Sequence, residues 1–179
     1  MLKGINKLLT GDLLKILCDM GHGDELVIAD ANFPAETCAQ RLVRLPDTDG
    51  VKAAEAVLSV LPLDTYSKYP ALIMDLTDGD KEKGMPEPTI WPEYEKLCGG
   101  LAKLERYAFY ERAKKAYAVI QTGEERQYGN LILVKGVVLA DEEPEEQVHA
   151  YLRGAEYYSN LSKRMEEPQT DPSYDSPPW

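Results

Sequence analysis

Short, uninterrupted runs of apolar residues alternate with segments of helical spacing along most of this chain. The runs expected to form strands are residues 26–29, 41–45, 71–76, 101–105, 118–121 and 130–138. Helices are expected between them, most clearly over 50–62 and 107–117. Strands that are apolar on both faces are typical of a parallel sheet covered by helices on each side. The pattern therefore predicts a single α/β domain with a mainly parallel sheet in three α/β/α layers.

Local signals place several helix ends. Thr10 can cap the start of a helix, and Gly21 stands where a C′ glycine belongs after that helix. Pro62 is expected to stop the helix that starts at residue 50, and Gly99 should end another. Residues 77–90 are rich in Asp, Gly, Pro and Lys, and they are predicted to form a loop.

Composition excludes some classes of protein. The chain has 179 residues, 44% of them apolar, and a net charge of −11 from 31 acids and 20 bases. That charge disfavours binding to a nucleic acid backbone, which needs a basic face. We expect no membrane span, because no run of about eighteen apolar residues exists. Three scattered cysteines and the lack of a secretory signal favour the cytoplasm.

Composition shifts after Ala140, so the chain is divided into a domain over 1–139 and an extension over 140–179. The extension is acidic and proline-rich, with a weak apolar stripe that allows one short helix. Its apolar groups are costly to leave in water. We therefore expect it to dock on its own domain or on a neighbouring copy of the chain.

His22 lies between two glycines in the segment GHGDE. A histidine side chain exchanges protons near neutral pH, and glycine neighbours permit close approach of a ligand. We expect this imidazole to lie near the strand end that carries Asp30. The alternative is a histidine in a connecting turn that bonds to the backbone. Asp24 or Glu25 could orient the ring, although capping or solvent exposure is the more common role.

Three further groups are candidates for ligand binding. Asp30 follows a buried strand, where open α/β sheets bind ligands, or else it forms an Asx-turn before Asn32. Arg106 could hold a hydroxyl or a developing oxyanion, or else pair with Glu111 on the surface. The aromatic residues that follow it are more often core than ligand platform. They are Tyr107, Phe109, Tyr110 and Tyr117.

The segment Tyr128–Asn130 offers side-chain donors and acceptors on either side of Gly129, which leaves the backbone accessible. The same residues are also typical of a β-turn that enters a strand. Neither histidines nor cysteines have the spacing of a metal site. We therefore predict no metal and no cofactor.

Several ordered segments together resemble the D-ribose pyranase / L-fucose mutarotase family. They are MLKGI, MGHGDELVIADANFPA, RYAFYERAKKAYAVIQTGE and YGNLILVKGVV. The likeness spans residues 1–139, with 77–90 its weakest part. It is nearest to the fucose mutarotase branch, whose GHGDE, DA-F-PA, FYERA and YGN patterns are present.

The resemblance implies an activity, an assembly and the roles of particular residues. His22 corresponds to the proton donor of the family's GH motif. The implied sugar-binding residues are Asp30, Arg106, Tyr128, Gly129 and Asn130. The family forms rings of subunits, so a pentamer or decamer with sites between neighbours is expected.

The implied reaction interconverts the anomers, and the pyranose and furanose forms, of a fucose-like monosaccharide by general acid–base catalysis. The alternative is a non-catalytic monosaccharide-binding module linked to sugar uptake or sensing. Such a module would keep Asp30 and Asn130 without needing His22.

Overall fold

The structure is a computed structural model that describes residues 2–139. The extension predicted over 140–179, with its short helix and its docking, lies outside the described residues.

The described residues form a single sheet with helices before and between its strands. Its strands are β1 (Glu25–Ala29), β2 (Leu42–Leu45), β3 (Ala71–Met74), β4 (Ala102–Leu104), β5 (Ala118–Thr122) and β6 (Leu131–Val134). The helices are α1 (Gly11–Asp19), α2 (Ala35–Cys38), α3 (Gly50–Leu58), α4 (Asp78–Glu82), α5 (Trp91–Cys98) and α6 (Arg106–Lys115). The order of the strands across the sheet is β2-β5-β1-β6-β3-β4.

The sheet is parallel except for β6. This strand lies between β1 and β3 and runs antiparallel to both, with Leu131 opposite Ile28 on one side and Ile73 on the other. The remaining strand pairs are all parallel. The prediction of a mainly parallel sheet is confirmed. The apolar run at 130–138 could not reveal the direction of β6, because a strand buried on both faces has the same composition in either direction.

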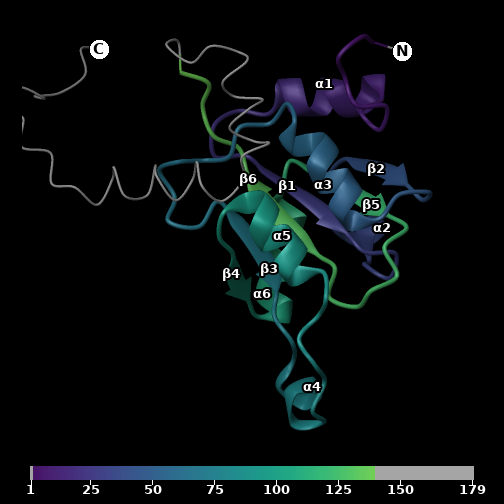
Figure 1. Cartoon of the computed structure of the whole chain (residues 1–179), viewed down its shortest axis with the longest axis vertical. Coiled ribbons are helices and arrows are strands. Elements are labelled where there is room, and N and C mark those ends of the chain that lie inside the picture. The colour runs from purple at the N-terminus through teal and green to yellow at the C-terminus, as the bar shows by residue number, and fades with distance from the viewer. Residues whose placement is uncertain (1, 140–179) are drawn as a thin grey trace, which may run out of the picture.

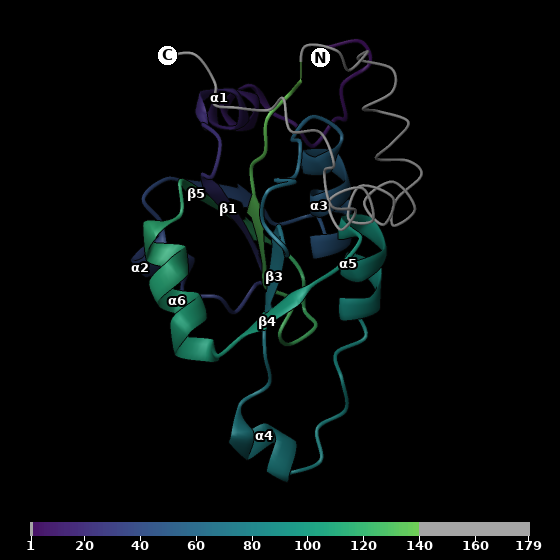
Figure 2. The same ribbon diagram turned by 90° about the vertical axis from the view of Figure 1, so that its left-hand side faces the viewer.

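Helices cover both faces of the sheet, as predicted. Figures 1 and 2 show α3 and α5 on one side and α2 and α6 on the other, with α1 over the upper end of the sheet. Successive residues of β1 pack into different cores: Ile28 lies with Leu13 and Tyr94, whereas Val27 lies with Phe109. This alternation follows from the two-residue period of a strand.

The predicted helix ends are confirmed in part. The Thr10 hydroxyl accepts a hydrogen bond from the Leu13 N–H, so it caps α1, and Gly99 ends α5 at a φ of 75°. Helix α3 ends at Leu58, earlier than predicted. A proline disfavours the helical conformation in the residue before it, so Leu61 lies outside the helix and α3 ends before Pro62.

One expectation holds only in part and another was wrong. Gly21 stands at the C′ position directly after Met20, the C-cap of α1, but it does not adopt the left-handed conformation, whereas Gly23 does, with a φ of 83°. The segment 77–90 is not all loop, because it contains α4, which extends from the lower end of the molecule in Figure 1. The Thr77 hydroxyl caps this helix by accepting from the Asp80 N–H. Helix α4 buries no side chain, so it carried no apolar periodicity that sequence analysis could detect.

Within residues 2–139, none of the helices combines the length and the apolar character that crossing a membrane requires.

The turn after β5 packs so closely that one residue tolerates no side chain. A Cβ on Gly123 would lie 2.0 Å from the Pro46 carbonyl oxygen, a backbone atom that cannot rotate away. Gly123→Ala should therefore lower the free energy of unfolding by about 1–3 kcal/mol. Urea unfolding followed by circular dichroism measures the loss. Gly100→Ala is the matched control, since a Cβ there meets nothing within 4 Å. Equal stability of the two variants would contradict the packing described here.

Candidate functional site

A polar cavity lies where the carboxyl ends of the parallel strands meet. Asp30 follows β1 and Arg106 follows β4, and the start of the antiparallel β6 brings Asn130 to the same edge. The cavity has a volume of about 500 Å³, within the range of small-molecule sites. Its lining comprises Asp30, Asn32, Phe33, Met74, Asp80, Arg106, Tyr110, Gln127, Tyr128 and Asn130.

Asp30 and Asn130 form a reciprocal pair at this edge. The Asn130 amide nitrogen donates to Asp30 Oδ2 at 2.7 Å, and the Asp30 N–H donates to Asn130 Oδ1 at 3.0 Å. Asp30 Oδ1 accepts from the Asn32 N–H at 3.0 Å, so the predicted Asx-turn also exists. Both side chains are buried, yet both line the cavity. The two interpretations of Asp30 are therefore compatible.

Burial raises the pKa of Asp30 above its ordinary value of 3.8. Hydrogen bonds from the Asn32 N–H and the Asn130 amide oppose this shift because they favour the carboxylate. A partly desolvated carboxylate accepts hydrogen bonds from sugar hydroxyls strongly, since water competes for it less.

Tyr128 has a strained backbone and a fixed hydroxyl. Its φ of 61° makes it the one non-glycine residue of the described chain with a positive φ. The hydroxyl donates to Asp80 Oδ2 at 2.5 Å and accepts from the Thr77 N–H at 3.3 Å. The bond from Tyr128 lowers the pKa of Asp80. Sequence analysis missed Asp80, because nothing in the loop-like segment around it indicated contact with a residue so distant in the chain.

Arg106 begins α6 and faces the cavity. Its Nε donates to the Tyr110 hydroxyl at 3.3 Å, and its guanidinium lies 5.7 Å from the centre of that ring. Glu111 pairs with Lys114 at 2.6 Å, and no carboxylate within residues 2–139 forms an ion pair with Arg106. The expected surface pair with Glu111 therefore does not form, and the guanidinium is available for a ligand.

The aromatic residues of α6 and its end have different roles. Phe109 is buried in the core beside Phe33. Tyr110 lines the cavity, Tyr107 is exposed, and Tyr117 stacks against Arg41. The expectation that these aromatics are mainly core holds in full for Phe109 and in part for Tyr110 and Tyr117, which are partly buried against the core, but not for Tyr107.

His22 does not lie near Asp30, so that expectation is wrong within one chain. His22 precedes β1 and Asp30 follows it, and this five-residue strand spans about 16 Å at roughly 3.3 Å per residue. His22 is absent from the lining of the cavity. Its side chain is 48% exposed, and its ring centre lies 5.5 Å from that of Tyr66.

Asp64 orients the His22 ring. The His22 Nε2 lies 3.1 Å from Asp64 Oδ1, and with the proton on Nε2, Nδ1 is left for a substrate. Asp64 is buried, and it also accepts hydrogen bonds from the Tyr66 and Ser67 N–H groups and from the Ser67 hydroxyl. Burial alone would raise the pKa of Asp64, but these bonds and His22 together lower it.

Neither acid next to His22 orients the imidazole. Asp24 accepts from the Gly21 N–H at 2.7 Å, and Glu25 pairs with Arg112. Asp64 was missed by sequence analysis, although an aspartate three residues before a serine is typical of a side-chain turn. Such a turn signal does not show that a distant histidine lies beside it.

The family model for the RbsD / FucU transport protein family matches residues 3–138. The chain belongs to this family. The fucose mutarotase of Mus musculus is 52% identical over 146 residues, which cover 76% of this chain and 95% of that protein. The predicted family is therefore confirmed.

Two solved structures share the fold. The fucose mutarotase from Streptococcus pneumoniae in complex with L-fucose superposes with a TM-score of 0.71 at 41% identity, covering 77% of this chain and 100% of that one. The Bacillus subtilis RbsD complexed with D-ribose gives 0.59 at 26% identity, covering 78% and 100%. The predicted α/β fold is confirmed by these members of the RbsD / FucU family.

Within residues 2–139 of this family member, no group of three or more histidine, cysteine, aspartate and glutamate side chains is placed to hold a metal ion. The expected lack of a cofactor stays a prediction.

The two buried aspartates should titrate on opposite sides of 3.8, their ordinary pKa value. In a pH titration of ¹³C-labelled aspartate carboxyls by NMR, Asp30 should have its midpoint above that value and Asp64 below it. Asp30→Asn and Asp64→Asn variants assign the two signals.

The two shifts have opposite effects on stability. The folded state binds the Asp30 proton more tightly than the unfolded state. The Asp30 contribution to the free energy of unfolding therefore falls as pH rises from 3.8 through its folded pKa. The Asp64 contribution is fully present above 3.8 and is lost as pH falls through its lower folded pKa. Coincident midpoints would contradict the described environments.

Proposed function

We propose that this protein is a cytoplasmic mutarotase that interconverts the anomers of an L-fucose-like monosaccharide. The observation that carries the proposal is the Asp30–Asn130 pair in a polar cavity that Arg106 and Tyr128 also line. Those are residues to which the family resemblance assigns sugar binding. The 52% identity to a fucose mutarotase supports the same reaction.

Mutarotation requires two proton movements. A proton leaves the anomeric hydroxyl while another reaches the ring oxygen, so the ring opens to an aldehyde. The carbonyl group then presents its other face, and the reverse transfers close the ring. Atoms and electrons balance without an oxidant or a reductant. A general acid–base group contributes about 10²–10⁴-fold to such a step.

Each side chain has a separate task in this scheme. Asp30 accepts hydrogen bonds from sugar hydroxyls, and Asn130 holds that carboxylate in place at 2.7 Å. Arg106 stabilises negative charge that develops on oxygen. The Tyr128 hydroxyl contributes a further polar contact. Gly129 does not line the cavity, and its carbonyl accepts from the Tyr94 hydroxyl, so its part is to position its two neighbours. His22 transfers the proton through Nδ1, while Asp64 holds Nε2.

The histidine must come from a neighbouring copy of the chain. Strand β1 separates His22 from Asp30 in one subunit, so the two cannot touch the same monosaccharide there. The exposed His22 and the more exposed Tyr66 beside it lie where a neighbour can be reached. A ring in which each subunit offers His22 to the next subunit's cavity satisfies both facts, and it agrees with the assembly that the family resemblance implies.

The separation also favours a second candidate function for an isolated subunit. One chain alone carries the binding cavity without the histidine, as expected of a non-catalytic sugar-binding module. Catalysis by assembled subunits and binding by single subunits are therefore distinguished by experiment.

A reducing compartment suits the cysteines. Cys18, Cys38 and Cys98 are all free thiols, and unpaired cysteines are typical of cytoplasmic proteins.

His22→Asn should lower the rate of anomer exchange by at least about tenfold and leave the fold unchanged. Saturation-transfer NMR on the anomeric protons of L-fucose, D-ribose and other aldoses measures exchange and identifies the preferred sugar. His149→Asn is the matched control, because His149 lies outside the region that matches the family model. An unchanged rate in folded His22→Asn would refute the role of His22. Absence of exchange by the unmodified protein with every aldose would refute the proposed reaction.

Two inactive variants should restore each other if the site is shared between subunits. Co-expressed His22→Asn and Asn130→Ala chains with different tags yield mixed rings, which tandem purification isolates. In a random equal mixture, about a quarter of the interfaces join an intact cavity to an intact His22. Exchange should therefore recover to that order in mixed rings and stay low in each variant alone. No recovery in mixed rings would contradict a shared site.

A further inference from the structure

The segment between β5 and β6 holds the proposed sugar-binding residues without regular secondary structure. Residues 123–130 contain only a bend and a turn, and Tyr128 adopts the left-handed conformation there. Such a conformation in a residue with a side chain persists only when the surroundings enforce it. The contacts that hold Tyr128 in this conformation come from residues beside the cavity. No sugar-binding role has been assigned to those residues.

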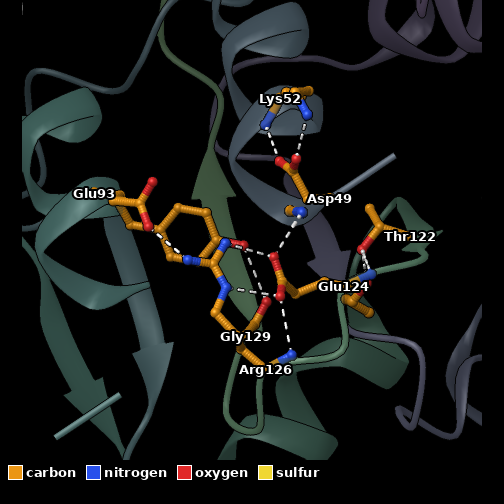
Figure 3. Close-up of polar contacts among 10 residues, drawn as sticks. Asp49, Lys52, Glu93, Thr122, Glu124, Arg126 and Gly129 are labelled. Carbon is orange, nitrogen blue, oxygen red and sulfur yellow. Dashed lines mark hydrogen bonds and ion pairs between the residues drawn. The ribbon is translucent and has the colours of Figure 1, made fainter. Parts of the chain in front are cut away.

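Glu124 and Arg126 form a bidentate ion pair in the first half of this segment (Figure 3). Glu124 Oε1 and Oε2 each accept from the guanidinium at 2.8 Å, through Nε and Nη2. Oε1 also accepts from the Arg126 N–H at 2.9 Å. The Glu124 side chain is 4% exposed and that of Arg126 is 35% exposed, so the carboxylate is shielded from water while part of the guanidinium reaches it.

The pair anchors the segment to two helices. Glu124 Oε2 accepts from the Gly50 N–H at 3.1 Å, at the start of α3. The Arg126 Nη1 donates to Glu93 of α5 at 2.5 Å. Figure 3 shows Arg126 extended between Glu124 and Glu93. Because α3 and α5 pack on the sheet, the segment is held against a rigid support.

The anchored pair is in direct contact with the sugar-binding residues. A Cβ on Gly129 would lie 2.8 Å from the Glu124 Cγ, so the backbone there packs directly on Glu124. The Tyr94 hydroxyl donates to the Gly129 carbonyl at 3.0 Å, and the Trp91 indole donates to the Tyr128 carbonyl at 3.1 Å. The backbone of Tyr128 and Gly129 is thus held by contacts with both Glu124 and α5.

We propose that Glu124 and Arg126 are positioning residues that hold Tyr128–Asn130 in the conformation that binds sugar. Neither residue lines the cavity, so they act through the segment rather than on the ligand. A partly buried ion pair adds little net stability, but the geometry of a bidentate pair is specific. The hydrogen bond from Arg126 lowers the pKa of Glu124, so the carboxylate remains charged. The proposal rests on the proposed sugar-binding role of Tyr128–Asn130.

The test compares Glu124→Gln and Arg126→Lys in the full chain. Glutamine places an N–H₂ group against the donors of Arg126 or Gly50, and lysine lacks the fork that fits both oxygens. The half-saturating L-fucose concentration for anomer exchange should rise on the order of tenfold in each variant. The maximal exchange rate should fall less, because the proton-transfer group His22 is unchanged.

The Trp91 indole N–H reports the position of the segment without any sugar. Its ¹⁵N–¹H resonance depends on the bond to the Tyr128 carbonyl and should shift in both variants. A Trp179→Phe variant removes the only other tryptophan signal. Thr10→Ala is the control for a purely structural effect. It removes the cap of α1 and should lower Tm while leaving both the indole resonance and the half-saturating concentration unchanged.

An unshifted indole with unchanged half-saturation in folded Glu124→Gln would overturn the proposal, and Arg126→Lys decides it if Glu124→Gln does not fold. Full recovery of half-saturation in Glu124→Gln/Arg126→Met would also overturn it, because the pair would then only neutralise a buried charge. If the unmodified protein exchanges no sugar, the proposed function fails. The indole resonance then still decides whether the pair positions the segment.

Discussion

The antiparallel insertion of β6 between β1 and β3 is the constraint on which the candidate site depends. Because β6 is separated from β5 by β1, the connection over 123–130 must cross the carboxyl end of β1. That crossing brings Asn130 against Asp30 and places Gly129 above it. A parallel strand in the same position would begin at the opposite edge of the sheet, and neither contact would form. The cavity therefore follows from the direction of one short strand.

The candidate groups lie at opposite ends of β1. At one end, burial raises the pKa of Asp30 and makes its carboxylate a strong acceptor. At the other, several hydrogen bonds keep Asp64 ionised, so it can fix the ring of His22. A sugar cannot bridge the two ends of one β1. Distance within the fold, rather than any missing residue, is what makes assembly a requirement of the proposed chemistry.

Much of the fold was predictable because it depends on local patterns. Buried strands appear as apolar runs, Thr10 caps a helix, and Gly99 ends one at a positive φ. Helix α4 was not predictable, because it buries nothing and so carries no periodic apolar residues. Of the site, Asp30 and Asn130 were identified from their strand-end positions and the family resemblance. Asp64 and Asp80 were missed, because each acts on a residue that is remote in sequence.

By itself, the sequence determined the family, the α/β class and the identity of the candidate residues, because these depend on composition, periodicity and ordered motifs. Only the tertiary structure decided how those residues are grouped. It separated His22 from Asp30, supplied Asp64 to the histidine, and brought Glu124 and α5 into contact with the backbone of Tyr128 and Gly129. The physical reason is that the order and direction of the strands determine which strand ends, and so which loops, lie side by side. Strands with the same apolar composition pair equally well in several orders.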